Sequence, residues 1–590
     1  MTRLGDVAAS AIRIQMPNRI AQLAAPVALL LCLLGSAWAQ QVPNAGSILR
    51  QLEPQTPELP APKADSSRKS APAAAPSGPL IHVRVFRIEG NQRIGTDQIQ
   101  HLLAAYLNRD LSPADLREAT DSIAHLYDRA GRLARVLVPA QRVENGDLLI
   151  QVIEGRFGEV VFPDDTDLKA LHVSPERIVA RVQSRLTPGA PLSSSDLTRG
   201  VLLAGDLPGV GVTADEISGA EAGLTDVLLT VKNQDLVSGQ FAIDNYGEAS
   251  IGSERATGWL DFNSLFGFGE EFGVLGIVTP ELQFGRLSAA LPLNDNGLTL
   301  GLNAAGLNYE VHAPLWTASQ PHGGSDSFGA DLEYQLVRAT NHNLSIGMTL
   351  LRKNFYDDNI AGHVDDYSVY DAILFANGNL YDSLGKGGVS TASISAGRGW
   401  VSMAGSPAES ADRFGPDTQG QFGILRYRLD RTQKLSGSLT AYVSLSGQLS
   451  YQNLDASEEF YLGGPAGVRV YPVSSNGGST GRLLTTELRW MALKSSQCTC
   501  GIKAFYDMGH IRRNANTDFP TAPLPNSYFL QGAGLGAYGT AGGPVQLHAD
   551  GGPESGGQCL GRDPRQWADR RPAGHSGVGE SGMAVLIEYQ

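Results

Sequence analysis

The feature that most constrains the fold is a strict alternation of apolar and polar residues from Leu435 to Tyr451. The odd positions carry Leu, Gly, Ala, Val and Tyr, whereas the even positions carry Ser, Thr, Tyr and Gln. This period of two predicts a β-strand whose two faces meet different media. Strands of soluble proteins average about 5–6 residues, while a membrane-spanning strand needs about 9–11. The length of this segment is therefore typical of a transmembrane strand.

Helical periodicity disappears after Val237, and strand-like segments recur to the end of the chain. They begin near residues 239, 256, 270, 282, 297, 328, 343, 367, 388, 419, 435, 481, 501, 528, 543 and 583. An even number of strands with alternating short and long connections is typical of an outer-membrane barrel, which leaves no open sheet edge in lipid. The segment 235–590 is therefore expected to form a membrane β-barrel of 16 antiparallel strands. A soluble β-sandwich or propeller is the alternative.

The amino-terminal residues 1–39 have the composition of a secretory signal peptide. Arg13 and Arg19 precede an apolar run from Ala24 to Leu34, and Ala37-Trp38-Ala39 closes it. The run is too short to cross a bilayer, and small residues flank the expected cleavage point before Gln40. We expect an exported protein, with an uncleaved membrane anchor as the alternative.

Two further points concern this amino-terminal segment. Translation could start at Met1 or at Met16, and the sequence leaves both open. Cys32 is expected to leave with the signal peptide, which keeps only three of the four cysteines in the mature chain. So few cysteines exclude a disulfide scaffold and a Cys-rich zinc module.

A short helix and a linker follow the signal peptide. Asn44 can cap a helix from Ala45 to Glu53, within the segment 40–53. A helix of this length is marginal in isolation, so we expect it to dock into another part of the protein. The proline-rich segment 54–79 is expected to be an extended linker.

Two similar α+β units are expected between the linker and the barrel. The first unit, 80–155, has strand Ile81–Glu89, helices near 96–107 and 113–130, and strands 132–138 and 147–154. The second, 156–234, has strand 157–162, helices near 174–185 and 193–204, and strands near 209–217 and 224–232. A β-α-α-β-β order that recurs after about 75 residues indicates tandem small domains.

Two neighbouring barrel strands indicate what the lumen contains. Their alternation directs Leu484, Thr486, Leu488, Trp490, Ile502, Ala504 and Tyr506 to lipid. The opposite register directs Glu487, Arg489, Lys503, Phe505 and Asp507 inward. A charge that faces lipid near the middle of the membrane costs about 2–4 kcal/mol, so the inward register is favoured. We expect a polar lumen with charges of both signs.

Five motifs resemble those of the haemolysin-activator-type (TpsB, ShlB/FhaC/HecB-like) transporters of two-partner secretion, in the BamA-like superfamily. Leu192–Val210 is similar to the second POTRA domain of that family, and Asp244–Gly247 is similar to the start of its first barrel strand. Phe460–Pro465 leads into Val468–Tyr471, which resembles the VRGY-type signature of the sixth extracellular loop. Phe505–Gly509 resembles the family's F-x-D strand motif.

The resemblance implies two POTRA domains before the barrel and a loop folded back into it. In that arrangement Arg469 of the loop meets Asp507 on the inner wall, and the pair fixes a conformation more than it stabilises the fold. The resemblance also assigns Gly463, Gly464, Val468 and Tyr471 to the loop motif and Phe505 to the strand motif. Val470 stands where the family signature has glycine, and valine suits any extended position with negative φ.

The function that the resemblance implies is export of an unfolded exoprotein, captured by the POTRA domains and passed through the barrel. The helix at 45–53 and the tucked loop are expected to close the resting pore. The implied partners are a secreted exoprotein of the haemolysin or adhesin type encoded nearby, outer-membrane lipid, and the barrel-assembly machinery. The implied location is the bacterial outer membrane, with the POTRA domains in the periplasm. A BamA-like insertase is the main alternative; a passive porin and a secreted enzyme are the others.

The chain offers no catalytic motif, cofactor or metal. Gly534–Gly539 matches G-x-G-x-x-G without the helix that a dinucleotide site needs. A net charge of −14 argues against a nucleic-acid partner. A disulfide between Cys498 and Cys500 would be strained, so free thiols or a labile bridge are expected. The glycine-rich segment 551–582 is either a genuine long loop before the last strand, Met583–Gln590, or a frame-shifted stretch.

Overall fold

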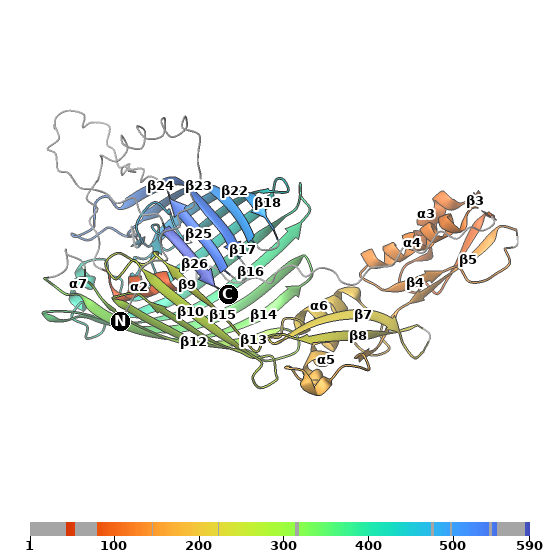
Figure 1. Ribbon diagram of the computed structural model, residues 1–590, viewed down its shortest axis with the longest axis horizontal. Helices are drawn as coiled ribbons and strands as arrows, with labels where there is room; N and C mark the ends of the chain where they lie inside the picture. The colour runs from red at the N-terminus through yellow and green to blue at the C-terminus, as the bar shows by residue number, and fades with distance from the viewer. Residues whose placement is uncertain are drawn as a thin grey trace, which may run out of the picture.

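The computed structural model describes residues 43–53, 80–143, 145–221, 223–312, 318–473, 477–495, 498–541, 545–551 and 584–589. The expected signal peptide, the linker 54–79, Cys32, Cys559 and all but the first residue of the segment 551–582 lie outside these ranges. The described chain forms a closed barrel, two smaller units that extend from one end of the barrel, and a short helix inside it (Figure 1).

The barrel confirms the predicted fold class. Its strands pair antiparallel in chain order, and the last strand pairs with the first to close the sheet. The sixteen strands are β9 (Val237–Asp244), β10 (Arg255–Asn263), β11 (Glu271–Val278), β12 (Leu282–Pro292), β13 (Leu298–Glu310), β14 (His322–Arg338), β15 (His342–Asn359), β16 (Gly362–Asp382), β17 (Gly388–Ser402), β18 (Gly420–Lys434), β19 (Leu439–Leu449), β22 (Thr480–Lys494), β23 (Cys498–Arg512), β24 (Ser527–Ala541), β25 (Val545–Gly551) and β26 (Ala584–Tyr589).

One predicted strand is shorter in the structure. The alternating run from Leu435 to Tyr451 was expected to be a single strand, but β19 spans only Leu439–Leu449. The amides of Leu435 and Ser436 both donate to the carbonyl of Leu439, which makes a tight turn. Small Ser and Gly residues in this turn continue the alternation beyond the strand, and this explains the error.

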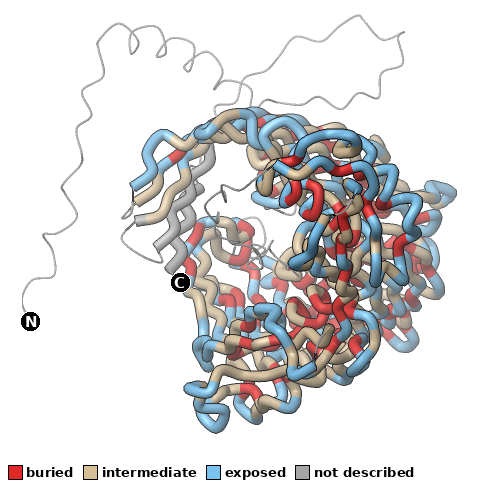
Figure 2. Tube along the Cα trace, turned by 90° about the vertical axis from the view of Figure 1, so that its right-hand side faces the viewer, coloured by how far each residue is buried: buried red, intermediate tan, exposed pale blue. Residues whose placement is uncertain are grey.

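The two faces of the strands follow the predicted alternation. On β19, Val443 and Leu445 are exposed on the outer face, while Ser444 and Gln448 are buried on the inner face. Along the trace, buried and exposed residues alternate over short intervals (Figure 2). On β22 and β23 the exposed side chains include Leu488, Trp490, Ile502 and Tyr506, and the buried ones include Glu487, Phe505 and Asp507. The predicted register of both strands is confirmed.

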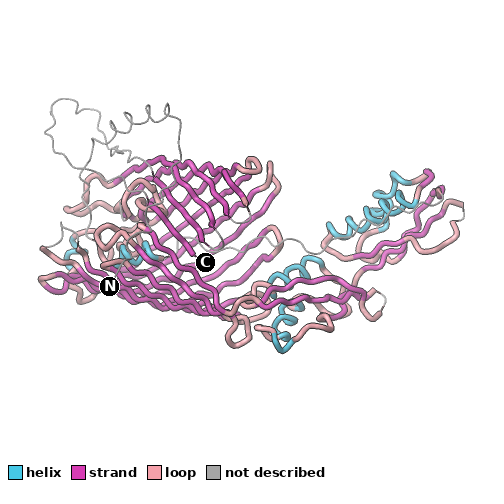
Figure 3. Tube along the Cα trace, viewed as in Figure 1, coloured by secondary structure: helices cyan, strands magenta, loops and turns pink. Residues whose placement is uncertain are grey.

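Each of the two smaller units has a three-stranded mixed sheet and a pair of helices (Figure 3). In the first, the sheet order is β2-β5-β4, and in the second it is β6-β8-β7. The elements of the first are β1 (Ile81–Val83), β2 (Val85–Glu89), α3 (Thr96–Leu103), η1 (Ala104–Tyr106), β3 (Arg109–Leu111), α4 (Pro113–Arg129), β4 (Ala134–Leu137) and β5 (Asp147–Glu154). Those of the second are β6 (Arg156–Val161), η2 (Leu168–Ala170), α5 (Pro175–Gln183), α6 (Ser194–Ala204), β7 (Val210–Ser218) and β8 (Leu224–Asn233).

The strand expected at Ile81–Glu89 is divided in two at Arg84. The amides of Arg84 and Val85 both donate to the carbonyl of Gly146. The first part, β1, pairs with β3, whereas the second part, β2, pairs parallel with β5. The apolar residues before and after Arg84 are consistent with either pairing. The sequence pattern alone therefore does not locate the break.

The second unit is held against the end of the barrel from which β9 starts. Arg338, at the end of β14, donates two hydrogen bonds to the Asp206 carboxylate, at 2.7 and 2.8 Å. Arg199 of α6 donates to the carbonyl of Asn296 at 2.9 Å and to that of Gln335. These contacts join the second unit to two turns of the barrel.

Among the described residues, the helices are all too short or too polar to cross a membrane.

The assignment of the outer face predicts the effect of a charge in the middle of β19. Leu445→Arg places a guanidinium on the exposed face and should lower the free energy of unfolding by about 2–4 kcal/mol. The measurement is urea unfolding of the protein refolded into phospholipid vesicles. Ser446→Arg, which points into the lumen cavity, is the matched control. Equal losses in the two variants would contradict the assignment of the faces.

Candidate functional site

The loop between β19 and β22 turns back into the barrel. It is the sixth connection at the end of the barrel away from the two smaller units. Short strands β20 (Phe460–Tyr461) and β21 (Gly477–Gly478) pair within it. Its tip is compact, because the amide of Val468 donates to the carbonyl of Leu462 and the amide of Gly464 donates to that of Tyr471. The predicted loop motif therefore forms one structured turn.

Arg469 at the tip of this loop contacts Asp507 on the inner wall of β23. Its Nε donates to Oδ2 and its Nη2 donates to Oδ1, both at 2.8 Å, and its backbone amide donates to Oδ2 at 3.2 Å. The Asp507 side chain is fully buried, and that of Arg469 is 10% exposed. Hydrogen bonds of this bidentate kind fix the geometry of both groups. The structure thus brings together the two residues that the family resemblance paired.

Three other predicted residues surround this pair. The guanidinium of Arg469 also donates to Glu487, and Glu487 in turn accepts from Arg489 at 2.7 Å. The guanidinium carbon of Arg469 lies over the Phe505 ring, 3.8 Å from its centroid, a cation–π arrangement. Two arginines and two carboxylates leave this group without net charge. We call Arg469, Asp507 and Glu487 the loop lock.

The lock is electrostatically matched to its buried position. Burial alone would lower the pKa of Arg469, but the hydrogen bonds to Asp507 and the charge of Glu487 raise it above its ordinary value. Removal of one charged partner from such a group leaves a buried charge uncompensated. Lys503, the last predicted lumen charge, lies on β23 opposite Arg489 in the register.

Two glycines of the wall make room for the loop. A Cβ at Gly509 would lie 2.5 Å from Leu462, and one at Gly532 would lie 2.2 Å from Val470. Both distances are shorter than any real contact, so larger residues there would displace the loop. Gly532 of β24 admits the side chain of Val470. Val470, which stands where the family signature has glycine, is therefore accommodated by a glycine in the wall.

The predicted amino-terminal helix, α2 (Ala45–Leu52), lies inside the barrel. Asn44 caps it, accepting a hydrogen bond from the amide of Ser47 at 2.8 Å. Ala45, Ile48 and Leu49 are buried in a cluster with wall residues of several strands. That cluster contains Ile251, Leu282, Phe284, Leu307, Tyr309, Phe355, Tyr367, Val369, Val401, Phe422 and Leu454. The docking site that the short helix requires is thus the lumen wall.

The start of the helix is also tied to the wall by hydrogen bonds. The amide of Ala45 donates to Asp357 at 3.0 Å, and the hydroxyl of Tyr309 donates to the same oxygen at 2.5 Å. Gly46 lies so close to its neighbours that a Cβ there would be 2.7 Å from the Tyr367 hydroxyl and 3.1 Å from the amide nitrogen of Ser457. The helix therefore contacts both the wall and the inward-folded loop.

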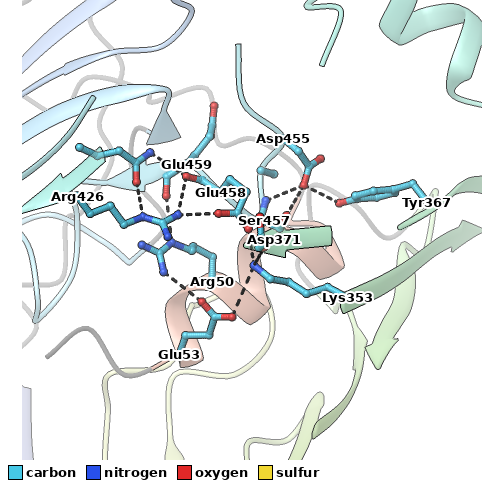
Figure 4. A network of polar contacts seen from close by, with 12 residues as sticks. Arg50, Glu53, Lys353, Tyr367, Asp371, Arg426, Asp455, Ser457, Glu458 and Glu459 are labelled. Atoms are coloured by element: carbon cyan, nitrogen blue, oxygen red, sulfur yellow. Dashed lines mark hydrogen bonds and ion pairs between the residues drawn. The ribbon is translucent and has the colours of Figure 1, made fainter. Parts of the chain in front are cut away.

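A buried network of charges joins the helix, the wall and the loop (Figure 4). Lys353 of β15 points into it and forms an ion pair with Glu458 of the loop. The same ammonium lies 3.6 Å from Asp371 of β16 and 3.8 Å from Glu53 at the end of α2. Lys353 is 3% exposed and Glu458 is 1% exposed. One lysine thus contacts all three parts.

Two arginines complete the network. Arg426 of β18 donates to the Glu458 carboxylate at 2.7 Å, and Arg50 of α2 donates to Glu53 at 3.1 Å and to the carbonyl of Glu459 at 3.4 Å. Burial by itself would raise the pKa of Glu458, but the positive charges of Lys353, Arg426 and Arg50 outweigh it and lower the pKa below its ordinary range. Glu458 therefore stays ionised at neutral pH.

The sequence reasoning did not identify this second network. Its members come from α2, three strands and the loop, and no short motif joins them. Two signals were available in the sequence. One is the position of Lys353 among the residues of its strand that alternate toward the lumen, and the other is the acidic run that precedes Phe460. Neither signal predicts which side chains contact one another.

Between the helix, the loop and the wall lies a cavity of about 450 Å³. Arg50, Arg426, Arg428, Glu248 and Phe460 are among its lining residues. A volume of this order is that of a small-molecule cleft. Within the described ranges, groups of three or more His, Cys, Asp or Glu placed to hold a metal are absent.

The remaining sequence features are placed as follows. Gly534–Gly539 lies within strand β24, without the loop and helix of a dinucleotide site. Cys498 and Cys500 begin β23 and are free thiols. Asp244 forms an ion pair with Arg255 at 3.0 Å, at the ends of the first two barrel strands.

A closed antiparallel barrel whose lumen holds a helix and an inward-folded loop, preceded by two α+β units, defines an outer-membrane transporter of polypeptides. The chain belongs to the haemolysin secretion/activation protein family ShlB/FhaC/HecB, whose profile matches residues 223–539. Residues 81–155 match the ShlB-type POTRA domain. The protein is thus an outer-membrane translocator of two-partner secretion that exports an exoprotein, with its POTRA domains in the periplasm.

Individual relatives agree with this assignment. The chain is 24% identical to the heme/hemopexin transporter protein HuxB of Haemophilus influenzae over 88% of its length and 93% of the relative's. It is 22% identical to the outer membrane transporter CdiB of Dickeya dadantii over 76% and 79% of the two chains. The fold is similar to that of CdiB from Escherichia coli, with a TM-score of 0.65 at 20% identity over 90% and 93%. It is also similar to that of BamA from Haemophilus ducreyi, with a TM-score of 0.51 at 14% identity over 86% and 99%.

The loop lock predicts the outcome of Arg469→Ala. The change leaves the buried carboxylates without their guanidinium and should destabilise the inward position of the loop by about 3–5 kcal/mol. The loop should become cleavable by protease added to whole cells, and export of the exoprotein should fall to background. Arg482→Ala, at an exposed position of β22, is the control. Normal export by Arg469→Ala would show that the lock has no part in transport.

Proposed function

We propose that this protein is a gated exporter. In it, α2 and the inward-folded loop, which the loop lock holds in place, close the lumen until an exoprotein engages the POTRA domains. The observation that carries the proposal is the Lys353 network, because it ties the helix, the loop and the wall to one another. A helix and a loop held by shared charges would leave together more readily than separately. If the helix and the loop left the lumen in two separate steps, the one that remained would have to keep its position without the contacts of the other.

The direction of transport requires no nucleotide in this proposal. The POTRA domains hold an unfolded exoprotein, partly by addition of a strand to an exposed sheet edge. Strands β6 and β7 are the edges of the second sheet. The exoprotein then passes the lumen and folds outside, which makes its return unfavourable. The protein acts as a transporter and not as an enzyme.

We infer that the exported partner is a large surface or secreted protein of the haemolysin or adhesin type, encoded nearby. Two relatives are named as a heme/hemopexin transporter and as the outer membrane transporter CdiB, and the family is described as haemolysin secretion/activation proteins. Insertion of the chain into the outer membrane would use the barrel-assembly machinery. Nucleic acid is not among the proposed partners.

Deletion and restoration of the gene test the choice between exporter and insertase. Proteins of the medium and the cell surface are compared by mass spectrometry in the deleted and the complemented strain. One large exported protein should disappear and return, while other outer-membrane barrels stay at normal levels. A normal secretome combined with defective assembly of other barrels would favour the insertase.

A large side chain at position 46 is expected to displace α2 from the lumen while the POTRA domains stay unchanged. Gly46→Leu raises intrinsic helix propensity by less than about 1 kcal/mol, yet its side chain would collide with Tyr367 and with the backbone of Ser457. We expect a several-fold higher conductance in planar lipid bilayers. Gly95→Ala, where a Cβ would have no neighbour within 4 Å, is the control. An unchanged conductance would mean that the helix does not close the pore.

A further inference from the structure

The turn between β10 and β11, residues 264–270, carries three large apolar side chains that the protein leaves uncovered. Leu265 is 51% exposed, Phe266 is 66% exposed and Phe268 is 47% exposed. The rings of Phe266 and Phe268 stack with centroids 6.0 Å apart, and Phe266 meets Phe272 edge-on at 6.1 Å. An apolar group of this size on a surface indicates an interaction site.

This group continues the lipid-facing surface of the barrel. Phe272 is on β11, where it shares a face with the exposed residues Val274 and Val278. The opposite face of β11 carries Ile277, which is buried in the lumen cluster. Phe266 and Phe268 extend the outer face beyond the end of the strand, at the level where barrels carry aromatic girdles.

The turn holds these side chains in a defined position. The carboxylate of Glu270, which is fully buried, accepts hydrogen bonds from the amides of Phe266 and Phe268. The amide of Ser264 donates to the carbonyl of Glu270 at 2.7 Å. Gly267 and Gly269 have φ of +83° and +76°, a conformation that favours glycine. The aromatic group is therefore built on a closed turn.

The backbone side of the same turn holds the second POTRA unit. The hydroxyl of Ser264 donates to the carbonyl of Pro208, and the amide of Ser174 donates to the carbonyl of Gly267 at 2.9 Å. Leu207, which is 2% exposed, lies where a Cβ at Gly269 would be 2.2 Å from its Cδ2. The loop 205–209, between α6 and β7, is thus a docking loop.

We propose that the turn 264–270 is a lipid-anchored seat for the second POTRA unit. Leu265, Phe266 and Phe268 enter the interfacial region of the phospholipid leaflet that faces the periplasm. Transmembrane barrels carry girdles of aromatic residues in that region, and here the aromatic side chains are continuous with the lipid-facing wall. Because the other side of the turn holds the loop 205–209, the membrane surface itself sets the orientation of this POTRA unit relative to the pore.

Photo-cross-linking identifies what covers the aromatic group. The full-length chain is expressed in cells with p-benzoylphenylalanine in place of Phe266, irradiated, purified and analysed by mass spectrometry. We expect an adduct with phospholipid. The same residue in place of Ile217, an exposed position on β7 of the POTRA unit, should give no lipid adduct. An adduct with a protein at 266, or no adduct there, would overturn the proposal.

A distance measurement tests the orientation. Spin labels at positions 169 of the POTRA unit and 384 of the turn between β16 and β17 are placed in a chain whose four cysteines are serine. In phospholipid nanodiscs the paired change Phe266→Ser and Phe268→Ser should broaden the distance distribution, and the paired change to Trp should keep it narrow. Leu435→Ser, on another turn of the same end, should have no effect. A narrow distribution in the serine pair, or a broad one in the tryptophan pair, refutes the lipid-anchored seat.

Discussion

The pairing of β26 with β9 is the constraint on which the other parts of the structure depend. Hydrocarbon offers no partner to a backbone amide or carbonyl, so a sheet in lipid must have no free edge. Closure creates an interior that is separate from lipid, and only there can charged groups gather at low cost. The helix, the inward-folded loop and their ion pairs all lie in that interior. A sheet left open at this seam would expose backbone groups to hydrocarbon.

The charged groups in the lumen specify one conformation of the helix and the loop more than they stabilise the fold. Buried ion pairs repay their desolvation only in part, and hydrophobic residues would fill the same space at lower cost. Arg469 and Lys353 nevertheless each contact two carboxylates or more, which leaves few alternative positions for the loop. Such contacts can be exchanged for water when the parts separate. An apolar contact of the same area would resist separation in a water-filled pore.

The sequence predicted the barrel well because lipid and lumen impose opposite preferences on alternate residues. It placed Asp507 and Glu487 on the inner face by parity alone, while the pairing of Asp507 with Arg469 came from the resemblance to a family. Parity also errs where small turn residues continue the pattern, as at Leu435. The Lys353 network was not predicted, since its members are separated by hundreds of residues. The role of the loop 205–209 was missed for the same reason, because its partners are turns of another domain.

The fit of Val470 against Gly532 has a consequence for evolution and for engineering. The two positions lie on different elements, yet together they divide one fixed volume between a side chain and the wall. A loop taken from a relative with a different residue at the first position would bring a hole or an overlap with it. Chimaeras that exchange the loop alone should therefore be poorly accommodated, and those that carry β24 with it should inherit a matched pair. The two residues of this contact therefore have to be exchanged together, although a complete hairpin lies between them in the sequence.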